Sequence, residues 1–178
     1  QGKRGLVMGV ANERSIAWGI ASALAAEGAE LAFSYQGEAF GKRVEPLAAS
    51  VGSDFLVDVD VTNDDSLDAC FDALKARWGT LDFLIHAIAF SDKTELTGRF
   101  INTSRANFQN SLTISCFSFI DVSRRAAELM PDGGSAAEHL TGSALTAIGV
   151  VGPAIAGRHH IAMRVQRDDW AIAVMSAH

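Results

Sequence analysis

The residues with the clearest chemical role stand in a turn near the start of the chain. The turn reads Gly9-Val10-Ala11-Asn12-Glu13-Arg14-Ser15-Ile16-Ala17-Trp18-Gly19. A turn that binds dinucleotide phosphates needs glycine where the backbone bends, and it needs a helix N-terminus aimed at the pyrophosphate. Gly9 would supply the bend, Ser15 a hydroxyl at the helix start and Gly19 close helix packing. Because the Gly-x-Gly-x-x-Gly spacing is missing, the turn favours phosphate binding without establishing it.

A neutral residue follows the next apolar run of the chain. Gln36 stands directly after Glu30–Tyr35, where a nucleotide-binding sheet contacts the adenosine ribose. An acidic residue at this point suits the free hydroxyl of NAD, and a basic residue suits the phosphate of NADP. A glutamine in a surface turn is the alternative interpretation of Gln36.

Two further strand ends carry informative residues. Asp60 and Val61 close the run Phe55–Val61, and Asp60 could also cap the helix that follows. The small residues of His86-Ala87-Ile88-Ala89-Phe90-Ser91 would let the main chain approach a ribose and a nicotinamide. His86 is interpreted as a structural residue, because a lone histidine at a buried strand end seldom has a catalytic partner.

The elements that must position these residues alternate along the chain. Short apolar runs predict strands at 5–9, 30–35, 55–61 and 81–87. Helical spacing predicts helices at 15–27, 38–51, 63–78 and Ser104–Met130, with a loop at 90–103. The order β-α-β-α-β-α-β-α indicates an α/β fold, a Rossmann-type doubly wound parallel sheet. Ligands of such a sheet bind beyond the carboxyl ends of its strands, where all the turns above lie.

Details of three helices are also predicted. The first should be capped by Ser15 and bury Ile16, Ile20, Ala23 and Leu24 on one face. Pro46 should kink or split the second helix. Thr62 can cap the third.

The motifs together resemble one family. The string Gly-Val-Ala-x-x-x-Ser-Ile-Ala-x-Gly at residues 9–19, followed by Gln36 and the later strand ends, resembles the enoyl-acyl-carrier-protein reductases. These enzymes are a divergent branch of the short-chain dehydrogenase/reductase family. The resemblance runs from about residue 3 to residue 135. It implies an NADH-dependent oxidoreductase of fatty-acid biosynthesis that transfers hydride to the double bond of an acyl-carrier-protein-linked enoyl thioester.

The resemblance also implies roles for single residues. Gln36 matches the glutamine of NADH-using members, Asp60 would lie beside the adenine, and Val61 would lie against the adenine face. Ile88 would contact the cofactor and Ser91 the acyl substrate. The implied cofactor-binding residues for NAD(H) are Gly9, Ser15, Ile16, Gln36, Asp60, Val61 and Ile88. The helix Ser104–Met130 resembles a helix behind the family's active site and could form a homo-oligomer face.

The resemblance stops after Ser135. There the family continues with a strand and a helix that carries a tyrosine and a lysine, which stabilise the enolate and hold the nicotinamide ribose. The single tyrosine of this chain is Tyr35 and its last lysine is Lys93, so no catalytic residue is identifiable. We expect an incomplete NAD-binding domain at 1–135 and an atypical segment of unknown fold at 136–178.

Two stretches of this segment have no clear assignment from sequence. Ala144–Gly152 could be a strand or a broken turn, and Asp168–Met175 a helix or a strand. We hypothesise a truncated or frameshifted reductase, because dense similarity ends within a few residues near codon 135. The other two reading frames of the gene test this hypothesis. The fourth strand would become an exposed edge, prone to pairing, unless the segment covers it.

Composition excludes several function classes. The net charge of -6 and a pI near 5.3 argue against nucleic acid as a partner. Cys70 and Cys116 lie far apart, and His139, His159, His160 and His178 fit no common metal spacing, so no metal site is predicted. Ala144–Gly157, the longest apolar stretch, falls short of the roughly 20 residues of a membrane helix. No signal peptide is visible, so a cytoplasmic location is expected.

Two classes of function remain open. The first is an enzyme, an NADH-dependent enoyl-acyl-carrier-protein reductase, although the missing tyrosine and lysine make turnover by this chain alone unexpected. The alternative is a protein without catalysis, either a dinucleotide-binding module or a subunit-interaction module that pairs through Ser104–Met130.

Overall fold

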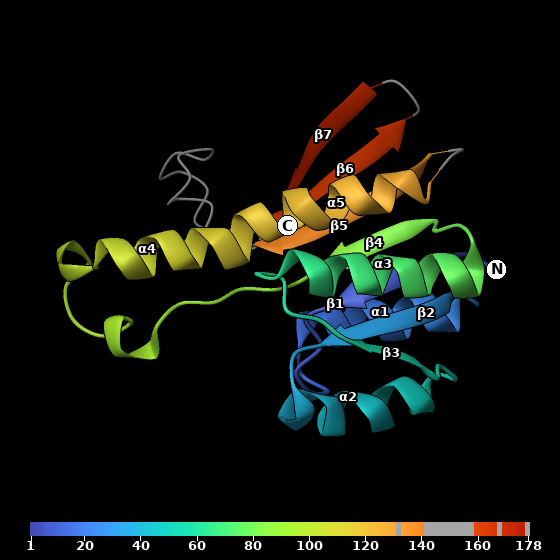
Figure 1. Ribbon diagram of the computed structural model, residues 1–178, viewed down its shortest axis with the longest axis horizontal. Helices are drawn as coiled ribbons and strands as arrows, with labels where there is room; N and C mark the ends of the chain where they lie inside the picture. Colours follow the sequence, from blue (N-terminus) through green and yellow to red (C-terminus); the bar gives the residue numbers. More distant parts are fainter. Residues whose placement is uncertain (131–132, 141–158, 167–168, 177–178) are drawn as a thin grey trace.

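The computed structural model describes residues 1–130, 133–140, 159–166 and 169–176. Its described strands form one sheet in the order β3-β2-β1-β4-β5-β6-β7 (Figure 1). Their bounds are β1 Arg4–Met8, β2 Glu30–Tyr35, β3 Phe55–Asp58, β4 Phe83–His86, β5 Gly134–Leu140, β6 His159–Gln166 and β7 Asp169–Ser176.

The first five strands are parallel, as the alternation of strands and helices predicts. β1 lies between β2 and β4, with Val7 level with Phe33 on one side and with Ile85 on the other. All five strands therefore end at the same edge of the sheet. The chain turns to opposite sides of β1 to form β2 and β4, and such a switch point is where ligands of this architecture bind.

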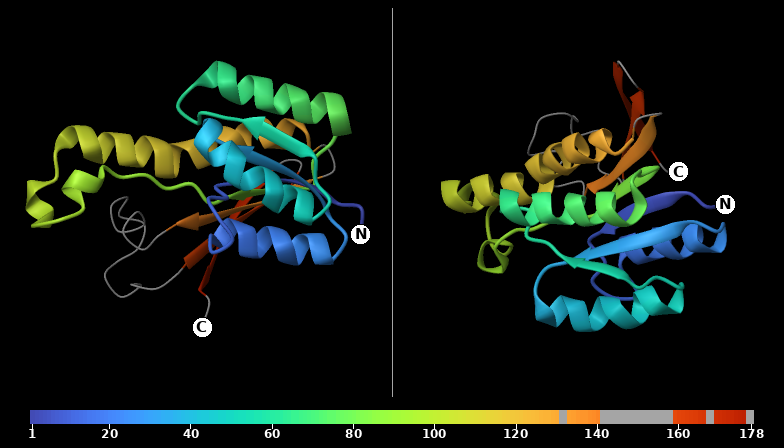
Figure 2. Two further views of the ribbon diagram at one scale, coloured as in Figure 1. Left: turned by 90° about the horizontal axis from the view of Figure 1, so that it is seen from below. Right: turned by 45° about the vertical axis from the view of Figure 1, so that its right-hand side comes forward.

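Helices cover both faces of the sheet. Their bounds are α1 Ile16–Ala26, α2 Glu38–Ser50, α3 Asp64–Trp78, α4 Arg105–Leu112 and α5 Ser118–Glu128. α1 and α2 pack on the face that carries Val7 and Phe33, and α3 and α5 pack on the opposite face, which carries Leu6 and Leu84 (Figure 2). Neighbouring residues of a strand thus belong to different cores, which confirms the doubly wound class.

The predicted elements are confirmed, with corrections at some bounds and faces. The predicted buried face of α1 is right in part: Ile20 and Leu24 pack partly buried against the core, whereas Ile16 and Ala23 are exposed. The fully buried residues of the helix are Ala17 and Ala21. The two alanines lie four residues apart and let the helix approach the sheet closely. Gly19 is also exposed, and a Cβ added there would meet open space, so it does not serve close packing.

Pro46 does not split the second helix. α2 runs without interruption from Glu38 to Ser50, although a proline within a helix removes one main-chain hydrogen bond. Val44 and Ala48 are fully buried on either side of Pro46. Their packing against the sheet holds the helix together where that bond is lost.

The cap of α3 also differs from the prediction. Asn63 is the N-cap residue, and its side chain accepts a hydrogen bond from the Ser66 amide. Thr62 instead donates to Asp60 through its amide and its hydroxyl. Asp60 therefore stabilises the turn after β3, one step before the helix begins, and does not cap the helix itself.

The long fourth helix is not uniform. A π-turn at Thr113–Phe117 separates α4 from α5, where the sequence predicted one helix from Ser104 to Met130. Ser104 caps α4 by accepting a hydrogen bond from the Asn107 amide. α4 and the loop before it extend beyond the carboxyl ends of the strands (Figures 1 and 2). Two short 3-10 turns, Lys93–Glu95 and Phe100–Asn102, lie in that loop.

The atypical segment extends the sheet. β5 pairs in parallel with β4, so β4 is not the exposed edge that an uncovered fourth strand would have been. β6 and β7 are antiparallel to their neighbours, and β7 settles the alternatives for Asp168–Met175 as a strand over Asp169–Ser176. Ala144–Gly152, Ala144–Gly157, Asp168 and His178 lie outside the described residues. The division at residue 135 remains a prediction.

His86 lies at the centre of the core that α5 covers. The side chain is fully buried at the end of β4, 2.8 Å from the Ser118 hydroxyl through Nε2 and beside the Phe119 ring. Burial lowers its pKa from 6.5 to about 3, because the imidazolium would lose its hydration. Of the two interpretations of His86, this environment fits the structural one.

The burial of a neutral histidine predicts a pH dependence of stability. His86 takes up a proton near pH 6.5 in the unfolded chain but only near pH 3 in the folded chain. Stability from this group is therefore complete above pH 6.5 and is lost as the pH falls toward 3. Between about pH 7 and about pH 5 the loss should be about 2 kcal/mol. Urea unfolding at both pH values should show this loss, and His86→Gln should lack it. Equal losses in both proteins would contradict the assignment.

Within the described part of the chain, no helix is both long enough and apolar enough to cross a membrane.

Candidate functional site

A cavity of about 430 Å³ opens at the carboxyl ends of β1, β2, β3 and β4. Five of the seven predicted cofactor-binding residues line it: Gly9, Gln36, Asp60, Val61 and Ile88. They follow four different strands and span 80 positions of the sequence, from residue 9 to residue 88. The parallel sheet brings them together because every strand ends at the same edge.

Gly9 allows β1 and β4 to end against each other. It has a positive φ of 95°, and a Cβ added to it would lie 2.1 Å from the carbonyl oxygen of Ala87. No side chain fits at that distance from a main-chain oxygen. Glycine is thus required here by the approach of the two strand ends, in addition to the turn predicted from the sequence.

Ser15 and Ile16 lie outside the cavity wall. Ser15 is the N-cap residue of α1, but its hydroxyl caps no helix amide. That hydroxyl donates to the Asn12 carbonyl at 2.6 Å and accepts a hydrogen bond from the amide of Ala11 at 3.4 Å. Ala11 does line the cavity. Ser15 therefore shapes the loop that forms one wall, and Ile16 begins the helix behind it.

Asp60 is the only charged residue among those that line the cavity in the described chain. Hydrogen bonds from the Thr62 hydroxyl and amide, together with one from Gln36, lower the pKa of its carboxyl group. Asp60 thus stays ionised at neutral pH, and the bond to Gln36 joins the turns that follow β2 and β3. Nearby, the carboxylate of Asp58 accepts a hydrogen bond from the Gly37 amide at 2.8 Å.

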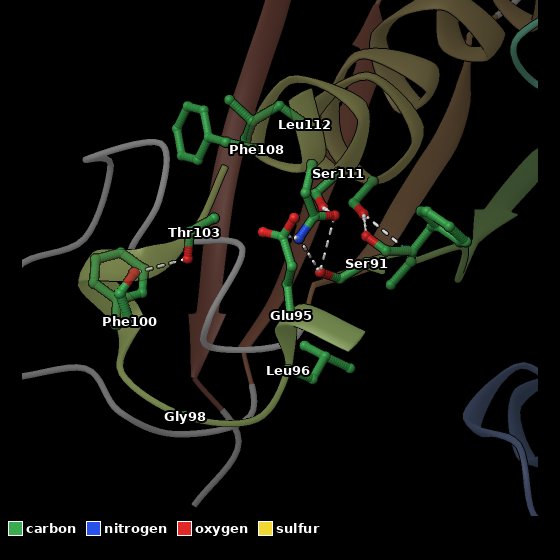
Figure 3. A pocket seen from close by; sticks show the side chains of 13 residues that line it. Ser91, Glu95, Leu96, Gly98, Phe100, Thr103, Phe108, Ser111 and Leu112 are labelled. Carbon is green, nitrogen blue, oxygen red and sulfur yellow. Dashed lines mark hydrogen bonds between the residues drawn. The ribbon is translucent and has the colours of Figure 1, made fainter. Parts of the chain in front are cut away.

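A second cavity of about 530 Å³ adjoins the first, and Ser91 lines it. Apolar side chains line much of this cavity, among them Leu96, Phe100, Phe108 and Leu112. Figure 3 shows the polar lining residues Ser91, Glu95 and Ser111 pointing toward one another, with hydrogen bonds drawn as dashed lines. Ala89 and Phe90 line both cavities, so a single stretch of main chain forms their common wall.

Asn107 connects the polar residues of the second cavity. Its side-chain oxygen accepts from the Asp92 amide at 2.9 Å and from Ser111 at 3.3 Å, and its amide group donates to Ser91 and Glu95. Glu95 in turn accepts from the amide and the hydroxyl of Ser104. Since Asn107 is buried, this network fixes the 91–95 loop on the first turn of α4.

Several lining residues were not predicted from the sequence. Tyr35, Phe40, Asn110 and Ile114 line the first cavity, and Asn107 and Ser115 line the second. Tyr35 is the last residue of β2 and directly precedes Gln36, so its position at a strand end could have identified it. The helix residues gave no such signal, because which of their side chains face the cavity depends on how each helix packs against the sheet. In the described part of the chain, no group of three or more metal-ligating side chains is present.

The family model described as "Enoyl-(Acyl carrier protein) reductase" matches residues 9–165 of this sequence. The chain belongs to the enoyl-acyl-carrier-protein reductase family. The resemblance of single motifs extends to residue 135, whereas the match to the family model continues to residue 165. Between 136 and 165 this member of the family nevertheless has neither a tyrosine nor a lysine.

Curated relatives confirm the family. The chain is 64% identical over 134 residues to "Enoyl-[acyl-carrier-protein] reductase [NADH] 2" of Rhizobium meliloti, covering 75% of this chain and 50% of that protein. It is 53% identical over 135 residues to "Enoyl-[acyl-carrier-protein] reductase [NADH] FabI" of Rickettsia bellii, covering 76% of this chain and 52% of that protein. The chain thus spans about half the length of the curated relatives it matches.

Solved structures agree in fold. FabI from Candidatus Liberibacter asiaticus matches with a TM-score of 0.74 and 59% identity, over 75% of this chain and 52% of that one. An enoyl-acyl-carrier-protein reductase from Anaplasma phagocytophilum, solved in complex with NAD, matches with a TM-score of 0.74 and 51% identity. That match covers 76% of this chain and 52% of the other.

The geometry at Gly9 predicts opposite effects for two alanine substitutions. Gly9→Ala should cost more than the roughly 1–2 kcal/mol of a left-handed alanine, since its Cβ would also meet the Ala87 oxygen. Gly19→Ala, in an open position of α1, should stabilise the chain by up to about 1 kcal/mol. Urea unfolding of both variants measures the two changes. A Gly9→Ala variant as stable as the parent would show that β1 and β4 do not end in contact.

Proposed function

We propose that this chain binds NAD(H) in the cavity at Gly9, as the nucleotide-binding part of an NADH-dependent enoyl-acyl-carrier-protein reductase. The observation that carries the proposal is the meeting of Gly9, Gln36, Asp60, Val61 and Ile88 in one cavity. The family resemblance names these residues independently of the geometry. A relative whose name includes NADH and a relative solved with NAD support the same cofactor.

The residues present fit this cofactor. Gln36 and Asp60 would face the adenosine, since they follow β2 and β3, the strands on one side of β1. The turn at Gly9, at the start of α1, offers main-chain amides to the phosphates. Ile88, which follows β4 on the other side of β1, would face the nicotinamide ribose. NADH, when bound, supplies the hydride of the reaction.

The second cavity suits the substrate class implied by the family. An enoyl thioester has an apolar chain and a polar carbonyl, and the cavity at Ser91 is lined by both apolar and polar residues. The two cavities adjoin across Ala89 and Phe90, so ligands in both would lie next to each other. We propose an acyl-carrier-protein-linked enoyl chain as the occupant, in cytoplasmic fatty-acid synthesis.

Binding and turnover should be separate properties of this chain. Reduction of an enoyl thioester requires a donor or cation where the enolate charge develops. The 136–178 segment has no tyrosine and no lysine that could take the family's roles. We therefore propose that this chain binds the dinucleotide without turnover. Oxidation of NADH with a crotonyl thioester would contradict the absence of turnover, and a failure to bind NADH would contradict the proposed function.

The proposed adenosine site predicts that a substitution of Asp60 lowers the affinity for NADH. Asp60→Asn keeps an acceptor for Thr62 but removes the charge, so the dissociation constant should rise about fivefold, the difference between a charged and a neutral hydrogen bond. Asp54→Asn is the control, because Asp54 is an exposed carboxylate just before β3, at the other end of that strand. Fluorescence titration with NADH measures both variants. An unchanged affinity in Asp60→Asn would place the adenosine elsewhere.

A second candidate function rests on the outer face of the long helix. Phe117 and Ile120 are 57% and 61% exposed, which is unusual for large apolar side chains three residues apart on one helix. We propose that this part of Ser104–Met130 pairs with another subunit.

The exposed helix face predicts self-association. Phe117→Lys should lower the average mass in sedimentation equilibrium toward that of the monomer, because a charge would replace buried contact area. Phe100→Lys is the control, since Phe100 is 83% exposed but lies in the preceding loop. A parent chain that is already monomeric at micromolar concentration would contradict this second candidate.

A further inference from the structure

We infer that Ser115 is a positioning residue that fixes the wall between the two cavities by binding the main chain of Phe90. The functional part of this inference rests on the proposed function, because the wall matters only if the cavities hold ligands. Ser115 lies on the long helix, far in sequence from the strand-end motifs.

The contact between Ser115 and Phe90 involves both main-chain groups of Phe90. The Phe90 amide donates to the Ser115 hydroxyl at 3.0 Å, and that hydroxyl lies 3.4 Å from the Phe90 carbonyl oxygen, to which it donates. Ser115 is buried, with 4% of its surface exposed. A buried hydroxyl that satisfies an amide and a carbonyl of one residue fixes that residue more firmly than packing alone.

A second serine holds the other end of the same segment. The Ser118 hydroxyl lies 2.8 Å from Nε2 of His86, the last residue of β4. It also donates to the Ile114 carbonyl at 2.5 Å, within the π-turn. Ser115 and Ser118 are three residues apart on one side of the helix, and they bind residues 90 and 86 respectively. The short segment between them therefore spans two fixed points.

This segment is the part of the chain that both cavities share. Ala87, Ile88, Ala89 and Phe90 line the first cavity, and Ala89 and Phe90 also line the second. The segment belongs to no strand or helix, and Phe90 is 46% exposed. Regular hydrogen bonding of a ladder therefore does not hold residue 90 in place, and the Ser115 hydroxyl takes that role.

The helix itself faces both cavities at this point. Asn110 and Ile114 line the first cavity, whereas Ser111 and Ser115 line the second. The π-turn at Thr113–Phe117 adds a residue to the turn and so changes which side chains face the sheet. Because Ser115 binds the main chain of Phe90, a shift of this helix would also shift the wall that the two cavities share.

A pair of isosteric substitutions tests the inference. Ser115→Thr keeps the hydroxyl, and Ser115→Val has nearly the same shape without it. Both add the same branch at Cβ, so any strain from that branch cancels in the comparison. Ser123→Thr and Ser123→Val form the control pair, because Ser123 is a buried serine of α5 that lines neither cavity.

Two measurements on the full chain are required. Amide exchange of Phe90, followed by NMR without any ligand, should be at least about fivefold faster in Ser115→Val than in Ser115→Thr. The dissociation constant of NADH, from fluorescence titration, should be about fivefold higher in Ser115→Val than in Ser115→Thr. The Ser123 pair should show neither difference.

The outcomes separate this inference from the proposed function. Equal amide exchange in Ser115→Val and Ser115→Thr overturns the inference, whether or not NADH binds. Faster exchange with equal NADH affinities overturns the functional part, since the wall would then be fixed without effect on the nucleotide. A parent chain that does not bind NADH contradicts the proposed function, while the exchange measurement still decides whether Ser115 fixes Phe90.

Discussion

The approach of residue 9 to the carbonyl of Ala87 is the contact on which the site depends. β1 lies at the switch point of the sheet, between β2 and β4, and its end must meet the end of β4 for one cavity to form. The 2.1 Å between a Cβ at position 9 and the Ala87 oxygen leaves no room for any side chain. A positive φ at the same residue turns the chain toward α1. One glycine therefore satisfies a steric and a conformational requirement together, and the loops on either side are arranged around it.

Hydrogen bonds of polar side chains hold the loops after β2, β3 and β4 in place around this contact. Asp60 joins the turns after β2 and β3 through Gln36 and Thr62, and its carboxyl group stays ionised because those bonds lower its pKa. Asn107 and Ser115 bind the loop that follows β4 to the long helix. These contacts lie at the rim of the sheet, where strand ladders end and side chains must satisfy the main chain. His86, by contrast, is buried and neutral, and it contributes to packing beneath the wall.

The segment after residue 135 adds strands to the sheet, but it contains no tyrosine and no lysine. β5 takes its place in the parallel sheet beside β4. β6 and β7 then run antiparallel, which needs no crossover helix between neighbouring strands. A strand can be added by backbone pairing with almost any apolar sequence, whereas a catalytic tyrosine and lysine require particular side chains. The parallel sheet and the cavity at its edge are therefore formed without a tyrosine or a lysine in the 136–178 segment.

The alternation of strands and helices, the family, and the strand ends that carry Gly9, Gln36, Asp60 and Ile88 could all be predicted from the amino-acid sequence. It also determined the absence of a second tyrosine, which no fold can supply. These features could be predicted because apolar runs, helix periods and glycine positions act within a single segment of chain. The asparagine cap of α3 could not, since Thr62 bonds to Asp60 and leaves the cap to Asn63. The continuous helix around Pro46 could not either, since the packing of Val44 and Ala48 overrode the local preference. The packing of the folded chain places Ser15 and Ile16 outside the cavity and Asn110 and Ile114 in its wall, and it brings Ser115 to Phe90. Several segments form a cavity together, and their relative orientation depends on core packing and on the π-helical segment at 113–117. Neither of these produces a periodic residue pattern that could be recognised in the sequence.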